Sequence, residues 1–158
     1  IFDVCSMSNA SHTTVLEAVG SDSRIGNKYF KGGYSYGGPC FPRDTKALSQ
    51  FINSVGINSV LIDATHQFNE YHSDLQFRQM KRKYSDFQIT FTDVTYKNNC
   101  KVPIIEESPK LKIAEKMALA GKRVIIKDGP LIIQKVKMEY GNLFEYQILD
   151  DNTKMHTI

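Results

Sequence analysis

Apolar residues recur at helical spacing through the first half of the chain. One predicted helix carries an apolar face with a spacing of three and four residues, expected to be buried: Leu48, Phe51, Ile52 and Val55. Gly56 ends this pattern. A shorter helix, with His12 at its exposed start, precedes it and ends near Gly20, and a long helix from about Ile62 to Lys83 follows it. The first half is therefore expected to be mostly helical.

The period changes after Phe87. Gln88–Thr92 alternates like a strand, and Arg123–Asp128 is a short apolar run before a Gly-Pro turn. A helix that Pro109 opens lies between them, and a second helix, Leu131–Tyr140, precedes a last strand around Phe144–Leu149. The order β-α-β-α-β predicts a parallel sheet with right-handed crossovers.

These patterns predict two domains. Residues 1–84 are expected to form a helical central domain, and residues 85–158 a partial Rossmann-like three-layer α/β domain with a parallel sheet. The second domain looks short, and we expect an incomplete tail after Asp150. With 158 residues and 41% hydrophobic content, the chain can bury one sizeable core or two small ones.

The net charge of the chain limits the kinds of partner that we expect it to bind. A formal net charge of +3 is compatible with an anionic ligand but too weak to indicate nucleic acid. The one dense basic run, residues 81–83, fits a solvated helix face better than a phosphate-binding stripe. Neither end reads as a signal peptide or a membrane anchor, so we expect no membrane partner.

A glycine-rich turn delivers a cysteine to the start of the helix that begins near residue 41. Cys40 follows Gly37 and Gly38, and the positive end of the helix dipole favours a thiolate there. Pro42 suits the first helical turn, and Asp44 can accept first-turn N–H groups or serve as a local acceptor. The residues alone also allow a packing cysteine, ordinary capping and glycines that only reverse the chain.

A resemblance to a known family favours the interpretation of Cys40 as a reactive thiolate over that of a packing cysteine. Four segments stand in the family's order and spacing: Asp22–Gly26, Tyr29–Lys31, Tyr36–Asp44 and Phe68–Tyr71. They resemble the central domain of the nucleotide-sugar dehydrogenases, and most closely the UDP-glucose branch. Val94–Lys97 and Glu107–Pro109 resemble the opening of the family's C-terminal UDP-binding domain more weakly.

The resemblance implies a four-electron oxidation at C6 of a nucleotide sugar, from alcohol through aldehyde to carboxylate, with two NAD in turn. For UDP-glucose the product would be UDP-glucuronate. By position Cys40 would be the nucleophile that holds the intermediate as a thiohemiacetal and then a thioester. Asp44 falls where the family keeps an aspartate that helps activate the hydrolytic water. The resemblance also implies a homodimer formed through the central helical domain.

Five further residues fall on the family's contacts with the sugar nucleotide: Arg24, Tyr29, Lys31, Gly37 and Lys97. The resemblance implies that Arg24 reaches across the dimer interface into the partner's site. These residue types suit the ligand, because a pyrophosphate needs cations and a flat base needs an aromatic surface. Without the resemblance, each of them would be read as an ordinary surface or core residue.

The chain also departs from the family. No Gly-x-Gly-x-x-Gly turn occurs, so we expect the NAD domain to precede Ile1. The segment that would carry the family's catalytic lysine and asparagine is expected to precede Ile1 as well, and this chain is expected to be inactive alone. Glu106 replaces an arginine expected to help hold NAD phosphates, and the family's paired aspartates are absent from the loop at 98–107. Asp93 stands where a glycine is usual.

These departures keep other functions open. A non-catalytic module for dimerisation and nucleotide-sugar binding is the alternative of a different class, and GDP-mannose is the alternative substrate. The three cysteines, Cys5, Cys40 and Cys100, have no metal-ligand spacing, so no metal site is expected. An odd number of cysteines without a disulfide framework favours a reducing compartment, and the cytoplasm is the simplest.

Overall fold

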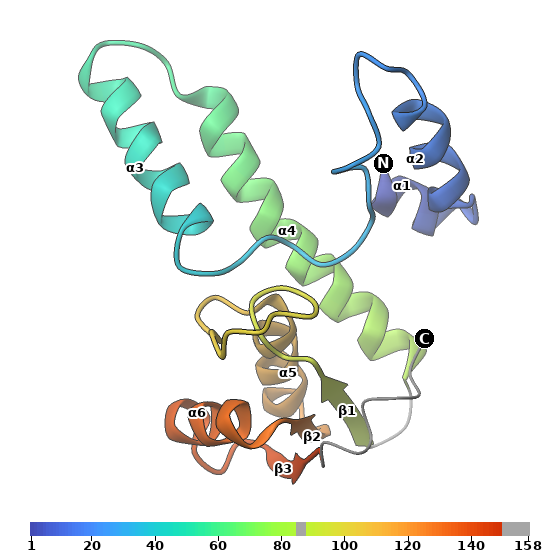
Figure 1. Ribbon diagram of the computed structural model, residues 1–158, viewed down its shortest axis with the longest axis vertical. Coiled ribbons are helices and arrows are strands. Elements are labelled where there is room, and N and C mark those ends of the chain that lie inside the picture. The colour runs from blue at the N-terminus through green and yellow to red at the C-terminus, as the bar shows by residue number, and fades with distance from the viewer. Residues whose placement is uncertain (85–87, 150–158) are drawn as a thin grey trace. The chain divides into compact units, whose positions relative to one another are not determined.

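The computed structural model describes residues 1–84 and 88–149 (Figure 1). Six helices and a three-stranded parallel sheet form there, which confirms the predicted combination of a helical part and an α/β part. Contacts divide the chain into two compact units, Ile1–Tyr34 and Ser35–Ile158, which are described separately. The predicted domain boundary at residues 84 and 85 touches the segment 85–87, which lies outside the described residues, as does the tail expected after Asp150.

The first unit contains two helices, α1 (Phe2–Ser8) and α2 (His12–Gly20). The sequence predicted α2 but not α1. Asn9 ends α1 in the left-handed region, with φ 57°, and the side chain of Ser11 caps α2 by accepting the N–H of Thr14 at 3.3 Å.

The second unit begins with a helical hairpin. α3 (Phe41–Ser54) and α4 (Val60–Lys83) run antiparallel, as Figure 1 shows. Pro42 lies in the first turn of α3, as predicted. Gly56 reverses the chain after α3 with φ +78°, a backbone conformation that residues with a Cβ rarely adopt.

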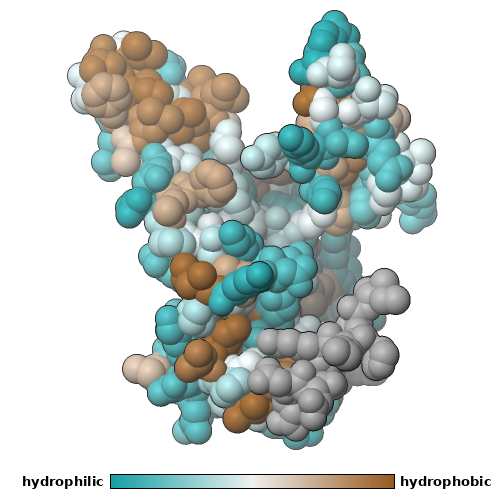
Figure 2. Space-filling view, viewed as in Figure 1, coloured by the Kyte–Doolittle hydropathy of each residue, from teal (hydrophilic) through white to brown (hydrophobic). Residues whose placement is uncertain are grey.

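The apolar face of α3 is not buried as the sequence predicted. Its side chains are 46% to 63% exposed at three of the four positions: Leu48, Phe51 and Val55. The side of the hairpin between the helices is polar instead, because the carboxylate of Asp63 accepts hydrogen bonds from Ser49 and Ser59, each at 2.6 Å. Hydrophobic residues therefore gather on the outside of the hairpin end (Figure 2).

The sheet consists of β1 (Gln88–Thr92), β2 (Arg123–Asp128) and β3 (Glu145–Ile148), in the order β1-β2-β3 with both pairs parallel. α5 (Pro109–Leu119) connects the first pair and α6 (Pro130–Tyr140) the second. The predicted β-α-β-α-β order is confirmed.

The hydrophobic core lies in the α/β part. α5 contributes fully buried Leu111, Ile113 and Met117, and consecutive residues of β2 are buried on both of its faces. Phe77 and Met80 of α4 pack against this core, so the long helix is anchored to the sheet. None of the helices in the described residues combines the length and hydrophobicity that a bilayer crossing requires.

Candidate functional site

Cys40 occupies the N-cap position of α3 and is exposed with a free thiol. Its carbonyl oxygen accepts the first helical hydrogen bond, from the N–H of Asp44 at 2.8 Å. The thiol therefore stands at the positive end of the helix dipole, as the sequence predicted. This address is suited to an anionic nucleophile.

Asp44 serves as a local acceptor. One of its carboxylate oxygens accepts a hydrogen bond from Nε of Arg43 at 2.8 Å. This hydrogen bond, the charge of Asp44 and, to a smaller extent, Cys40 raise the pKa of the Arg43 guanidinium. Both side chains are largely exposed, so the pair is open to an incoming ligand.

Gly37 and Gly38 let the loop before Cys40 touch another loop closely. A Cβ at Gly37 would lie 2.0 Å from the carbonyl oxygen of Glu107, and one at Gly38 would lie 2.4 Å from the ring of Tyr96. Gly38 also has φ +86°. The glycines thus permit close packing as well as a chain reversal.

Lys97 extends from the same loop as Tyr96 and is exposed. Its ammonium lies 5.2 Å from the centre of the Tyr96 ring, and the hydrogen bond and charge of Tyr96 raise the pKa of Lys97. Asp93, at the start of this loop, adopts φ 51°, so it takes a conformation that favours glycine. Its carboxylate accepts the N–H of Asn99 at 3.0 Å, which holds the loop.

The remaining predicted substrate residues lie in the first unit. Arg24 pairs with Asp22 at 2.6 Å, and this hydrogen bond lowers the pKa of the Asp22 carboxyl. Tyr29 is 96% exposed, so its ring is free of intramolecular packing. The ring of Tyr29 is therefore accessible to a ligand. The guanidinium of Arg24 is accessible too, apart from its pair with Asp22.

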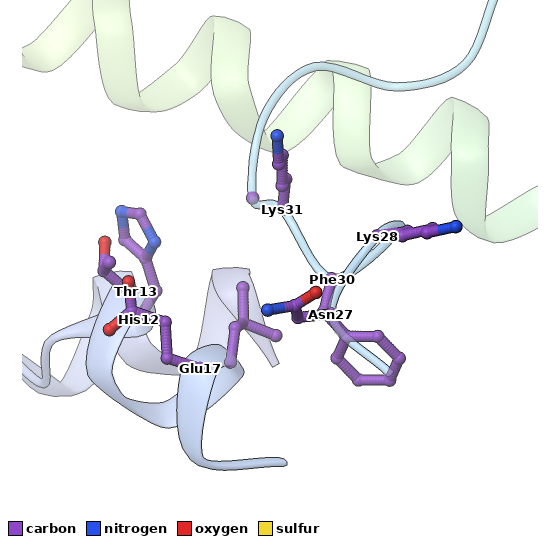
Figure 3. A pocket seen from close by; sticks show the side chains of 9 residues that line it. His12, Thr13, Glu17, Asn27, Lys28, Phe30 and Lys31 are labelled. Atoms are coloured by element: carbon purple, nitrogen blue, oxygen red, sulfur yellow. The ribbon is translucent and has the colours of Figure 1, made fainter. Parts of the chain in front are cut away.

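Lys31 contributes to a pocket of roughly 600 Å³ within the first unit (Figure 3). Helix α2 forms one wall with His12, Thr13, Leu16 and Glu17, and the segment 27–32 forms the other. Lys28, also in this segment, extends away from α2. The ring of His12 packs 4.6 Å from that of Phe2, so His12 is partly buried and not exposed as predicted.

Parts of the chain are similar to known dehydrogenases. Residues 1–71 match the sequence profile of the UDP-glucose/GDP-mannose dehydrogenase family, central domain. Two UDP-glucose 6-dehydrogenases of Bacillus subtilis are similar: TuaD is 44% identical over 70 residues, and YwqF is 26% identical over 150 residues. These matches cover 44% and 93% of this chain, and 15% and 33% of the relatives. Residues 1–71 therefore carry the central domain of the UDP-glucose/GDP-mannose dehydrogenase family.

A solved structure extends this relationship beyond the central domain. The UDP-glucose dehydrogenase from the hyperthermophilic archaeon Pyrobaculum islandicum superimposes with a TM-score of 0.75 at 29% identity, covering 88% of this chain and 32% of that one. The matches thus cover a third or less of the length of each of these relatives.

Glu106, which stands where the resemblance leads us to expect an arginine, lies in an acidic setting. Glu106, Glu107 and Glu139 line a groove of roughly 640 Å³ beside α6, where Lys135 is the basic residue. Glu107 also pairs with Lys112 at 2.5 Å. In the described residues, no three His, Cys, Asp or Glu side chains are grouped so that they could hold a metal ion.

The sequence did not identify two residues that hydrogen-bond to the loop of residues 35–39 before Cys40, the cysteine loop. Asn69 and Ser73 of α4 are buried polar residues facing that loop. Polar residues spaced four apart on one helix face were the available signal. Asn69 stood within a segment that carried the family resemblance, but its contact with the loop could not be read from the sequence.

Proposed function

We propose that this chain is the cysteine-bearing portion of an enzyme that oxidises UDP-glucose to UDP-glucuronate, and that Cys40 is its nucleophile. The observation that carries the proposal is the exposed Cys40 thiol at the N-cap of α3, within the residues that carry the family's central domain. The relatives named above, which are UDP-glucose dehydrogenases, support this substrate over GDP-mannose.

Cys40 would act on the C6 aldehyde. Its thiolate adds to the carbonyl carbon, so that a C–S bond forms, the C=O π bond breaks and the oxygen takes up a proton to give a thiohemiacetal. Asp44, one helical turn further, would help hold the water that later cleaves the thioester, and its pairing with Arg43 keeps its carboxylate at that end of the helix. Covalent capture keeps a reactive aldehyde from escaping.

NAD would be the hydride acceptor of this reaction. The described residues do not fit its phosphates, because three carboxylates, those of Glu106, Glu107 and Glu139, line the groove next to the loop 98–107. The sequence also lacks the glycine-rich turn that would bring backbone N–H groups to a pyrophosphate. No step of the chemistry is therefore assigned to NAD-binding residues of this chain.

In each unit, taken separately, the predicted substrate residues carry groups that suit a sugar nucleotide. Arg24 and Lys31 supply positive charge for the pyrophosphate, and Tyr29 supplies an exposed aromatic surface for the base. Gly37 and Lys97 would contact the ligand from the second unit. If the enzyme works in the cytoplasm, the reducing conditions there would keep the Cys40 thiol reduced.

The exposed face of the helical hairpin supports a homodimer. Beyond the α3 positions already described, α4 and its preceding turn expose Ile57, Val60 and Leu61, by 62% to 75%. The polar network of Asp63 occupies the space between the helices, so neither helix can bury this face against the other. A contiguous apolar surface of this kind marks an interface, and a second copy of this hairpin would cover it with a matching surface.

Calorimetric titration with UDP-glucose and with its C6 aldehyde tests the nucleophile without any need for NAD. The aldehyde is expected to bind at least about tenfold more tightly than the alcohol, because it gains a covalent bond to sulfur. Cys40→Ala should abolish this difference and leave UDP-glucose binding unchanged, whereas Cys100→Ala should preserve it. Equal affinities in the unmodified chain would refute the assignment, and tighter binding of GDP-mannose would change the substrate.

A further inference from the structure

We propose that Asn69 and Ser73 are positioning residues that hold the loop carrying Cys40 in its working place. This inference rests on the proposed role of Cys40 as nucleophile. Both residues lie on α4, four positions apart and therefore on one face of the helix. Their hydrogen bonds go to Ser35 and Tyr36, so each acts on Cys40 through the loop.

Asn69 holds the backbone of the loop at two points. Its side-chain oxygen accepts the N–H of Tyr36 at 2.8 Å, and its side-chain nitrogen donates to the carbonyl of the same residue at 3.0 Å. The Asn69 side chain is buried, so water does not compete well for these hydrogen bonds. Hydrogen bonds to both backbone groups of one residue, in the two peptide units that flank it, fix the orientation of the loop as well as its place, four residues before Cys40.

Ser73 holds the preceding residue. Its hydroxyl lies 2.5 Å from the hydroxyl of Ser35, and both serines are buried. Two consecutive loop residues, Ser35 and Tyr36, are thus held by two consecutive turns of α4.

The opposite side of the loop is also blocked. Gly37 and Gly38 lie against Glu107 and Tyr96, at distances that leave no room for a Cβ. The loop is therefore enclosed between α4 and the segment 96–107, and Pro39 leads directly from this enclosed part to Cys40. Losing the contacts to α4 would free one side of the loop while leaving α3 and the core intact.

Asp74 offers a matched control on the same helix. It forms an ion pair with Lys116 of α5. The hydrogen bonds to the cysteine loop described above come from Asn69 and Ser73 instead. Asp74→Ala should therefore affect the attachment of α4 without releasing the loop, while Asn69→Ala releases it. Ser73→Thr keeps a hydroxyl and serves as the conservative partner of Ser73→Ala.

The test compares the ratio of affinities for the C6 aldehyde and for UDP-glucose in the full chain. Asn69→Ala is expected to reduce this ratio about tenfold, since a displaced thiolate loses the covalent contribution, with a small change for UDP-glucose itself. Ser73→Ala should reduce it less, Ser73→Thr should restore it, and Asp74→Ala should leave it unchanged. An unchanged ratio in Asn69→Ala would overturn the inference.

Alkylation of Cys40 by iodoacetamide separates this inference from the proposed function. Asn69→Ala should lower the alkylation rate of Cys40 roughly threefold, because a freed loop lets Cys40 leave its N-cap conformation while the rest of α3 stays folded, and Cys100 in the same molecule should react as before. If the unmodified chain binds both ligands equally, the proposed function fails and the alkylation rate alone decides the inference. An equal Cys40 rate in Asn69→Ala and Asp74→Ala would refute positioning.

Discussion

Tyr36 shows how the cysteine loop combines a held backbone with an unsatisfied side chain. Asn69 satisfies both backbone groups of Tyr36, yet its phenol oxygen is buried and has no hydrogen-bond partner in the part of the chain that the structure describes. The ring packs edge-on against Phe41, 5.9 Å between centres, so the aromatic contact does not need the hydroxyl. A buried hydroxyl without a partner costs stability.

Tyr36→Phe is therefore expected to raise the free energy of unfolding by about 1 kcal/mol. Urea denaturation of the chain measures this change. Tyr146→Phe is the control, because the Tyr146 hydroxyl donates to the carbonyl of Gly141 at 2.7 Å and its removal should lower stability. A destabilised Tyr36→Phe variant would show that the hydroxyl has a stabilising role.

At the scale of elements, the polar interior of the α3–α4 hairpin depends on one ionised carboxylate. Hydrogen bonds from Ser49 and then Ser59, together with the charge of His66, lower the pKa of Asp63 from its ordinary value of 3.8. A lowered pKa means that the ionised form stabilises the fold above the ordinary value, and this contribution is lost as the pH falls through the lowered pKa.

Asp63→Asn is expected to reduce the melting temperature at pH 7, because the amide replaces an ionised acceptor of two hydroxyl hydrogen bonds. The difference from the unmodified chain should shrink as the pH falls below 3.8. Thermal scans between pH 7 and pH 2.5 measure it. A difference that stays constant over this range would exclude the ionised carboxylate as its source.

The elements themselves could be read from the sequence because their ends carry strong local signals. Pro42 and Pro109 mark helix starts that the structure reproduces. The helix α1 was missed, since its break from α2 depends on Asn9 adopting a left-handed conformation. Helical period also identified the apolar face of α3 but could not say what covers it, because burial depends on the neighbouring surface and not on the period.

At the scale of the whole molecule, the exposed apolar face of the α3–α4 hairpin determines the oligomeric state that we expect. Phe51 and Leu61 are 63% and 75% exposed, on the two helices of the hairpin. The double variant Phe51→Glu, Leu61→Glu should convert a dimer into a monomer, because burying unpaired charge is costly. Light scattering coupled to size exclusion measures the mass. Met138→Glu, at an 80% exposed site on α6, should remain dimeric, and a monomeric unmodified chain would reject the proposed interface.

The candidate site was only partly predictable at this scale. Local signals placed Cys40 and Asp44 on a helix start, and the structure agrees. The closeness of Gly37 to Glu107, and of Tyr36 to Asn69, joins segments far apart in the sequence, which no local pattern encodes.

The close contact at Gly37 limits how segments of this protein can be exchanged with those of its relatives. The cysteine loop and the segment before α5 meet backbone to backbone, so a cut between the helical and α/β halves separates two surfaces shaped for each other. A chimera that takes its cysteine helix from one relative and its sheet from another will join well only if residue 37 is glycine and the chain near residue 107 follows the same path. The exchangeable module is therefore the whole second unit.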